Sequence, residues 1–217
     1  MLTLGLRSPN LRAMRDRRTQ IIEAASAVMA RQGYQQTSID DVIKEAGLCG
    51  KAHFYHYFKS KEELGYAVLR HQFERFTERG LAILRDPMAE PLERLNLFID
   101  TVVASQAKHG CTGAGPCGMF AAEMVDMHEG FRQSVELLFE RWTAQLQALL
   151  WEARPQLKED VDIARLARFI VATLEGALFM SRVKREIRVL EGIAADLKRF
   201  VASHVRDGVA VPQGSDR

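Results

Sequence analysis

The fold is decided by residues 33–64, which read GYQQTSIDDVIKEAGLCGKAHFYHYFKSKEEL. Within this segment the apolar side chains recur at the i, i+3, i+4, i+7 spacing of one helix face, and they are Ile39, Val42, Ile43 and Ala46. Thr37 or Ser38 precedes this helix as its cap, and the acids Asp40 and Asp41 complete the cap and face the positive helix end. The pattern therefore predicts a short, capped helix in the middle of the segment.

Two further helices flank this one and complete a compact three-helix pattern. The first is expected over about residues 12–31, where Gly33 stops it, and the third over about 51–57, after the turn at Gly47. Helix, turn, short helix, turn and helix is the order of a helix-turn-helix unit, in which one helix crosses the DNA backbone and the next enters the major groove. Similar three-helix units also occur in proteins that never contact DNA, so the spacing alone leaves both interpretations open.

The rest of the chain also has helical spacing, and strand signals are nearly absent. Ser60-Lys61-Glu62-Glu63 is a capping box that opens a long helix. We therefore predict an all-α fold. Its expected parts are a helix-turn-helix domain over residues 12–60, a larger helical C-terminal domain over 61–207, and disordered tails over 1–11 and 208–217.

The composition fits a globular chain without a targeting segment. With 217 residues, 47% of them apolar, the chain can bury the core of one large or two modest domains. No apolar run approaches the roughly 20 residues that cross a membrane, and the N-terminus has no apolar stretch followed by a cleavage site. The three cysteines are an odd number without CxxC spacing. We therefore expect a cytoplasmic protein with free thiols.

Basic residues gather near the N-terminus, although the net charge of the whole chain is only +2. Residues 1–60 hold nine lysines and arginines against five acids. Five of those basic residues are Arg7, Arg12, Arg15, Arg17 and Arg18. A basic arm suits a polyanionic partner, because each contact with a phosphate releases condensed counterions. By charge alone, a solvated tail is an equal alternative.

Four stretches of this region add a more specific signal. They are Arg18–Ala25 (RTQIIEAA), Gly33–Val42 (GYQQTSIDDV), Ala46-Gly47, and Phe54–Leu64 (FYHYFKSKEEL). In this order they closely resemble the DNA-binding domain of TetR-family repressors, over about residues 15–70. The connection over Leu48–His53 is one residue longer than the usual family pattern. The resemblance implies a transcriptional regulator that binds double-stranded operator DNA.

The resemblance and the chemistry of the side chains together indicate a set of DNA-binding residues. Hydroxyls at a helix N-terminus bind phosphate, and lysines or histidines on a recognition helix donate to base edges. The residues that we expect to contact DNA are Arg17, Arg18, Thr37, Ser38, Lys51, His53, Tyr55, His56, Tyr57, Lys59 and Lys61. Phe54 and Phe58 are expected in the core, and core packing is an equal alternative for Tyr57.

The C-terminal region carries a weaker resemblance. Residues 115–126, GPCGMFAAEMVD, are similar to a glycine- and cysteine-containing segment of one group of TetR regulators, with the order of Cys and Pro exchanged. In the family the last two long helices pair with those of a second subunit, so a homodimer is expected here. The wide apolar face from Ile163 to Leu178 supports such an interface, and an ordinary core helix is the alternative.

An apolar cavity between the C-terminal helices is the expected effector site, for a small apolar or amphipathic molecule. Its candidate lining residues are Phe73, Phe76, Phe98, Val102, Met119, Phe120, Met124, Phe139, Trp142 and Phe179. Glu123 lies in an otherwise apolar stretch and is expected to fix a polar group of the ligand. Taken singly, each of these residues also fits the core, or for Glu123 the surface.

Cysteine chemistry is the alternative signal. Cys111 and Cys117 flank a glycine loop, and Cys117 falls near an expected helix start, where the helix dipole favours thiolate. A sensor of electrophiles or oxidants, as in some TetR regulators, is therefore the second hypothesis, and small buried thiols are its alternative. His109 and His128 lie nearby, but no spacing fits a zinc site, so neither a metal nor a cofactor is expected.

Two other classes of function receive little support. The sequence has no G-x-S-x-G, no phosphate-cradling glycine loop and no HExxH motif, so an enzyme is not expected. A helical enzyme without these motifs and a helical adaptor that binds only protein are the remaining alternatives. A gel shift with the promoter of its own operon separates the regulator from both.

Overall fold

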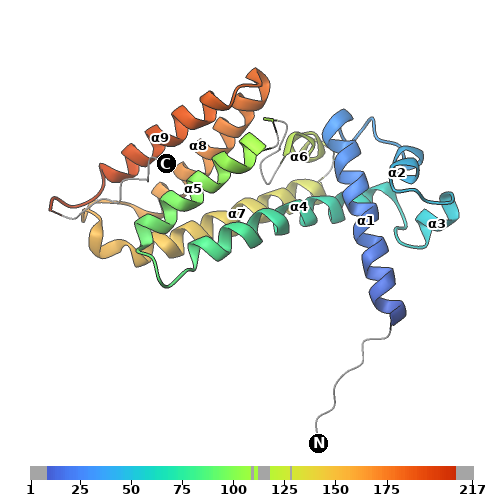
Figure 1. The fold of residues 1–217 in the computed structure, drawn as a ribbon, viewed down its shortest axis with the longest axis horizontal. Helices are drawn as coiled ribbons and strands as arrows, with labels where there is room; N and C mark the ends of the chain where they lie inside the picture. Colours follow the sequence, from blue (N-terminus) through green and yellow to red (C-terminus); the bar gives the residue numbers. More distant parts are fainter. Residues whose placement is uncertain (1–8, 109, 112–117, 128, 209–217) are drawn as a thin grey trace, which may run out of the picture. The chain divides into compact units, whose positions relative to one another are not determined.

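The computed structural model describes residues 9–108, 110–111, 118–127 and 129–208, and their regular structure is helical (Figure 1). The α-helices are α1 Pro9–Gln32, α2 Ile39–Glu45, α3 Lys51–Tyr55, α4 Lys61–Leu84, α5 Pro91–Lys108, α6 Gly118–Val125, α7 Glu129–Glu152, α8 Ile163–Lys184 and α9 Ile187–Ala202. A short 3-10 helix, Arg154–Gln156, follows α7. The predicted all-α fold is confirmed. Residues 9–11, which the sequence predicts in an N-terminal tail, belong to α1, whereas residues 1–8 and 209–217 of the two predicted tails lie outside the described residues.

The chain divides into two compact units. The first holds the described residues up to Gln72 together with 119–134, and the second holds the described residues between 73 and 118 and those from 135 onward. The sequence predicts a boundary at residue 60 because a capping box begins a helix there. The structure groups the first half of α4, up to Gln72, with the first unit, and Leu64 and Val68 on that half are fully buried.

The first unit packs around an apolar stripe of α1. The stripe consists of Ile21, Ala25, Val28 and Met29, and all four are buried. Phe54 and Phe58 are also fully buried, as predicted, with ring centroids 5.9 Å apart. The Ser38 cap of α2 has the predicted form: Ser38 Oγ accepts from the Asp41 N–H at 3.1 Å, and Asp41 Oδ2 accepts from the Ser38 N–H at 2.8 Å.

In the second unit α9 packs against both α5 and α8 (Figure 1). The apolar α8 residues that predict a dimer surface are instead buried within the chain, and they are Ile163, Leu166, Ala167, Ile170, Val171, Leu174, Ala177 and Leu178. For these residues the core alternative is correct, because this face of α8 forms part of the interior of its own unit. A different set of apolar side chains, which includes Phe169 and Phe179, lies exposed on α8.

Arg94 is a buried charge that joins three helix ends in the second unit. Its guanidinium donates to the carbonyl of Leu84, the last residue of α4, at 2.9 Å. It also pairs with Glu152, the last residue of α7, while Arg94 itself stands on α5. Orphan carbonyls at a helix end need such a donor when they are buried. The side chain therefore fixes where α4 and α7 end relative to α5.

We predict that Arg94→Met lowers the free energy of unfolding by about 2 kcal/mol, because the variant keeps the apolar stem and loses charge-assisted hydrogen bonds. Urea denaturation at neutral pH measures the change. Arg141→Met is the matched control, since Arg141 is exposed on α7, and it should change stability by less than about 0.5 kcal/mol. Equal stability of the two variants would contradict this role for Arg94.

Candidate functional site

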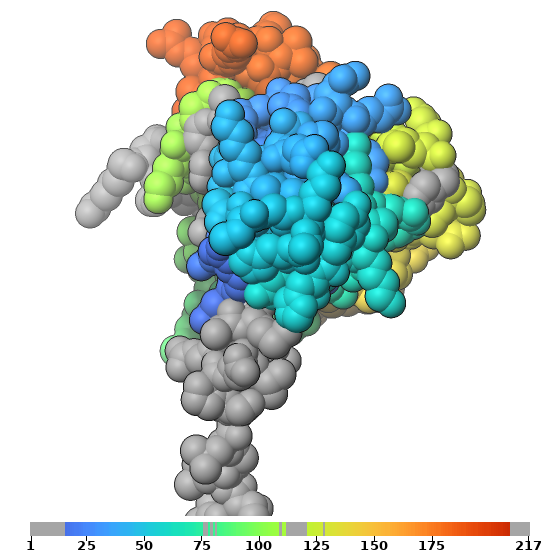
Figure 2. Space-filling view, turned by 90° about the vertical axis from the view of Figure 1, so that its right-hand side faces the viewer, coloured from blue at the N-terminus to red at the C-terminus, as the bar shows by residue number. Residues whose placement is uncertain are grey.

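The surface formed by α2, α3 and the segment that leads into α4 is the candidate site (Figure 2). The turn between α2 and α3 exposes Cys49 and ends at Gly50, which precedes α3 as its N-cap. Gly50 has a φ of 142°, a conformation that favours glycine. This glycine therefore allows the sharp change of direction that sets α3 apart from α2.

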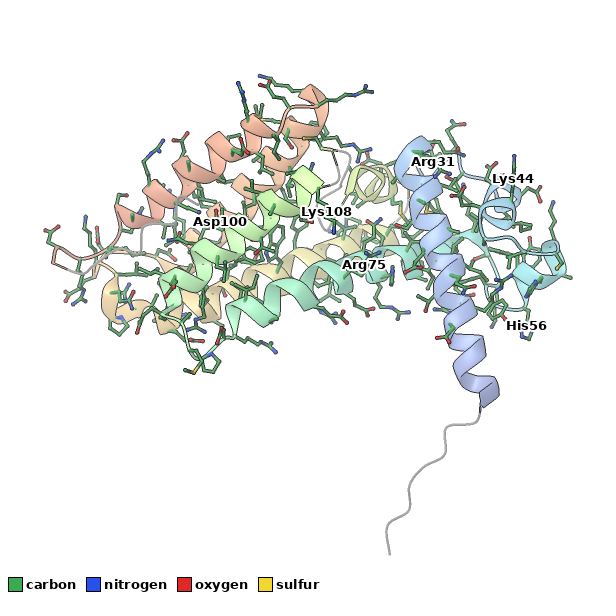
Figure 3. All side chains as sticks on the ribbon, in the orientation of Figure 1. Arg31, Lys44, His56, Arg75, Asp100 and Lys108 are labelled. Atoms are coloured by element: carbon green, nitrogen blue, oxygen red, sulfur yellow. The ribbon has the colours of Figure 1, made fainter. Side chains whose placement is uncertain are left out.

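Several of the predicted DNA-binding side chains lie exposed on or beside α3. Lys51, Tyr55, His56 and Lys59 are exposed, and Figure 3 labels His56 directly after the helix. Lys51 Nζ lies 3.2 Å from Asp40 Oδ2 on α2, and both side chains remain largely exposed. A cation in this position keeps most of its hydration and can exchange the carboxylate for a base or a phosphate.

His53 and Tyr57 are only partly exposed. Their rings lie 5.8 Å apart between centroids, and the ring of His56 stands edge-on to Tyr57 at 5.0 Å. Tyr57 is therefore both packed and accessible, which agrees with the two alternatives that the sequence leaves open. Its hydroxyl, together with that of Tyr55, adds a donor to the same surface.

The two arginines of α1 connect that helix to the turns of the site. Arg17 donates to the carbonyl of Gly47 at 3.1 Å. The guanidinium of Arg18 lies 4.5 Å from the centroid of the Phe58 ring, a cation–π contact. Both side chains remain partly exposed. They hold the site together and still present positive charge at its edge.

Thr37 and Lys61, two further predicted DNA contacts, face inward. Thr37 is 1% exposed, and its hydroxyl donates to the carbonyl of Gly33 at 2.6 Å. Lys61 Nζ donates to the carbonyl of Gln35 at 3.0 Å. Burial lowers the pKa of Lys61, and the charge of Glu123 opposes that shift. Thr37 and Lys61 are thus bound to backbone carbonyls of their own unit, and we do not propose them as contacts with DNA. Ser38, in contrast, is exposed at the start of α2.

Two family models match the chain: bacterial regulatory proteins of the tetR family over residues 21–68, and the C-terminal domain of LmrA/YxaF-like transcriptional regulators over residues 91–196. The chain belongs to the TetR family of bacterial transcriptional regulators. Proteins of this family bind DNA and are not enzymes.

Individual TetR-family relatives match most of the chain. The transcriptional regulator AcuR of Cereibacter sphaeroides is 29% identical over 170 residues, which cover 77% of this chain and 76% of AcuR. The HTH-type transcriptional repressor NemR of Escherichia coli is 22% identical over 194 residues, 87% of this chain and 95% of NemR. A crystal structure of regulatory protein TetR from Rhodobacter sphaeroides has a TM-score of 0.78 and 25% identity, covering 87% of this chain and 98% of that one.

In this TetR-family chain the predicted effector-lining residues fall into both compact units. The second unit holds Phe73, Phe98, Val102 and Trp142, which are buried, Phe139, which is partly exposed, and Phe179, which is 55% exposed on α8. The first unit holds Glu123 and the buried Met124. The side chains of Phe76, Met119 and Phe120 lie outside the described residues. The structure thus groups six of the predicted residues in the second unit, and Phe179 is the most exposed of them.

The cysteines differ in accessibility. Cys111 is 5% exposed and has a φ of 59°, while Cys49 is exposed in the helix-turn-helix unit. Cys117, His109 and His128 lie outside the described residues. Within the described part of the chain no three histidine, cysteine or acidic side chains gather as a metal site. None of the described helices combines the length and the hydropathy that a membrane crossing requires.

Glu175 on α8 is a site candidate that the sequence reasoning missed. Its Oε1 is buried without a hydrogen-bond partner in the described structure. Burial raises the pKa of this carboxyl from 4.5 to about 7. The sequence does contain a signal for this site, because Glu175 is the single charged residue in the apolar run 169–180, FIVATLEGALFM. Such a carboxyl is poised to accept a hydrogen bond or to bind a cation.

The raised pKa of Glu175 predicts a pH dependence of stability. The folded state binds the proton more tightly than the unfolded chain, so the stabilisation is complete below the unfolded pKa of 4.5 and is lost as the pH rises towards 7. The loss amounts to about 3 kcal/mol at most. Urea denaturation between pH 4.5 and 8 should show this fall in the wild type and not in Glu175→Gln. Glu140→Gln, at an exposed position on α7, is the control and should keep the wild-type profile.

Proposed function

We propose that this TetR-family regulator represses transcription as a homodimer bound to a pseudo-palindromic operator, and that a small molecule releases it. The observation that carries the proposal is the helix-turn-helix surface with its exposed basic and hydroxyl side chains around α3. The relative NemR is a transcriptional repressor by name, which supports repression rather than activation. Action on chromosomal DNA agrees with a cytoplasmic location.

Exposed apolar side chains on α8 and α9 support the dimer. They are Phe169, Phe179, Met180 and Val183 on α8 and Phe200 on α9. The rings of Phe169 and Phe200 lie 4.6 Å apart between centroids, so the two helices share one apolar surface. Contiguous exposed apolar surface marks a protein interface. A second copy related by two-fold symmetry is the occupant that the family relationship favours.

Within the helix-turn-helix unit the proposed contacts divide by chemistry. Lys51, Tyr55 and His56 stand on or beside α3 and offer donors to base edges. Lys59 lies beyond the helix at the start of α4, where an exposed ammonium suits phosphate. The remaining proposed contacts are Arg17, Arg18, Ser38, His53 and Tyr57, at the edges of this surface.

For the signal we favour reversible binding of an apolar or amphipathic effector in the second unit. Six predicted lining residues lie there, and Glu175 adds a carboxyl whose buried Oε1 can bind a polar group. The effector must bind the released conformation better than the DNA-bound one, because only such a difference shifts the equilibrium. The cysteine-based alternative loses support from the burial of Cys111, since a buried thiol is inert.

We predict that purified protein selects, from random duplexes, a pseudo-palindrome with half-sites about 10 base pairs apart or a multiple of that.

Lys59→Ala should weaken binding to every sequence and lower the slope of log K against log salt by about one unit, because one phosphate contact is lost. Lys51→Ala should instead change the selected sequence. Lys108→Ala, at an exposed position at the end of α5 (Figure 3), is the control and should change neither.

The outcome that contradicts this proposal is an asymmetric, single half-site footprint from a protein that is monomeric in solution. Uniform weakening by both Lys51→Ala and Lys59→Ala would keep the operator function and would overturn the assignment of base contacts to α3.

We predict that N-ethylmaleimide fails to release the operator from a Cys49→Ser variant, because the proposed effector acts without a thiol, Cys111 is buried, and the exposed Cys49 of the helix-turn-helix unit has been removed. Fluorescence anisotropy of a labelled operator measures the release. Release that disappears when Cys111→Ser and Cys117→Ser are added to this background would instead establish the thiol switch.

A further inference from the structure

The connection between α1 and α2 is held by a carboxylate from α6. Glu123 Oε2 accepts the backbone N–H of Tyr34 at 2.8 Å, and Glu123 Oε1 accepts the backbone N–H of Gln35 at 2.6 Å. The two oxygens of one side chain thus bind two consecutive peptide groups that are distant in the sequence. This contact lies wholly within the first compact unit.

The same connection is held by α4 from another direction. Lys61 Nζ donates to the carbonyl of Gln35 at 3.0 Å and lies 4.5 Å from the centroid of the Tyr34 ring. The peptide N–H of Gln35 is therefore bound by α6, and its carbonyl by α4. Hydrogen bonds to charged groups are the stronger ones in proteins, so two helices outside the helix-turn-helix unit define the position of this turn.

Two glycines, Gly33 and Gly65, allow neighbouring side chains to approach the backbone closely around this turn. A Cβ on Gly33 would lie 2.7 Å from Glu123 Oε2, and a Cβ on Gly65 of α4 would lie 2.8 Å from both Met124 Cε and Tyr34 Cε2. Glu123 of α6 thus reaches the turn beside Gly33, and its neighbour Met124 approaches α4 at Gly65, where the Tyr34 ring also lies. The position of α6 and the position of the turn cannot change independently.

The local helices do not need Glu123 for their own formation. The Gly33 N–H donates to the Met29 carbonyl and completes the end of α1, while Ser38 and Asp41 cap α2 by themselves. Glu123 instead holds the position of the turn at Tyr34 and Gln35. The helices α2 and α3 follow this turn in the chain, so their position depends on it. Loss of this carboxylate therefore alters where the recognition helix stands rather than whether it forms.

We propose that Glu123 is a positioning residue for operator binding, which holds the turn at Tyr34 and Gln35 and thereby sets where the recognition helix stands. The proposal rests on the proposed operator function. It assigns to Glu123 a role inside the protein, towards the backbone of Tyr34 and Gln35, in place of the ligand contact that the sequence predicts.

The first test compares Glu123→Gln and Glu123→Ala with the control Asp126→Asn, an exposed acid just beyond α6. Operator affinity should fall about tenfold or more in Glu123→Ala and less in Glu123→Gln, because one or both acceptors are lost. The salt slope should stay at the wild-type value, since no phosphate contact is removed. Hydrogen exchange at residues 34–37 should accelerate while the melting temperature stays within a few degrees of wild type.

A double-mutant cycle with Gly33→Ala separates this role from general destabilisation. In the wild type the added methyl group displaces Glu123 from the turn, whereas in Glu123→Ala only the cost of the positive φ of Gly33 remains. The loss of operator affinity caused by Gly33→Ala should therefore be smaller in the Glu123→Ala background, by at least about twofold.

Each outcome has a definite meaning. If the wild type selects no operator, the proposed function fails and this inference fails with it. If the wild type binds and the Glu123 variants bind equally well, or the cycle is additive, only the inference is overturned. A fall in affinity matched by loss of folded protein would reduce Glu123 to a structural residue and would also overturn it.

Discussion

The recognition helix α3 is five residues long, and a helix of this length does not persist in water on its own. Its shape depends on the burial of Phe54 and Phe58, each of which contributes roughly 1.5–3 kcal/mol through the surface it removes from water. Arg18 covers the ring of Phe58, and Arg17 reaches the carbonyl of Gly47 in the preceding turn. The side chains available to DNA are thus held in place by this buried aromatic pair, against which Arg18 and Tyr55 themselves pack.

Local chemistry explains what the sequence could predict. The capping of α2 by Ser38 and Asp41 follows from spacing within a few residues, and so does the helical content of the described chain. The sequence predicts that Lys61 contacts DNA and Glu123 a ligand, because residue type alone cannot reveal the backbone partners that both have in the turn at Tyr34 and Gln35. Phe179 shows the same limit, since helical periodicity identifies an apolar side chain without telling which neighbour covers it.

The second unit contains two ionisable side chains, Arg94 and Glu175, that are stabilised in the interior in different ways. The guanidinium of Arg94 donates to the carbonyl of Leu84 and pairs with Glu152, while its Nε has no partner in the described structure. Glu175 has no such donor at Oε1, and burial raises the pKa of its carboxyl to about 7, so the neutral form predominates below that pH. Arg94 therefore restrains the helix ends that it joins, whereas Oε1 of Glu175 has no hydrogen-bond donor in the described structure.

The approach of α4 to the turn at Tyr34 has an evolutionary consequence. A glycine inside a helix costs about 1 kcal/mol relative to alanine, so Gly65 persists only where its lack of a side chain is needed. Here any larger residue would meet the edge of the Tyr34 ring and the end of Met124. Substitution at Gly65 should therefore be tolerated in descendants of this chain only together with a smaller residue at one of those two positions, and these positions should covary across the lineage.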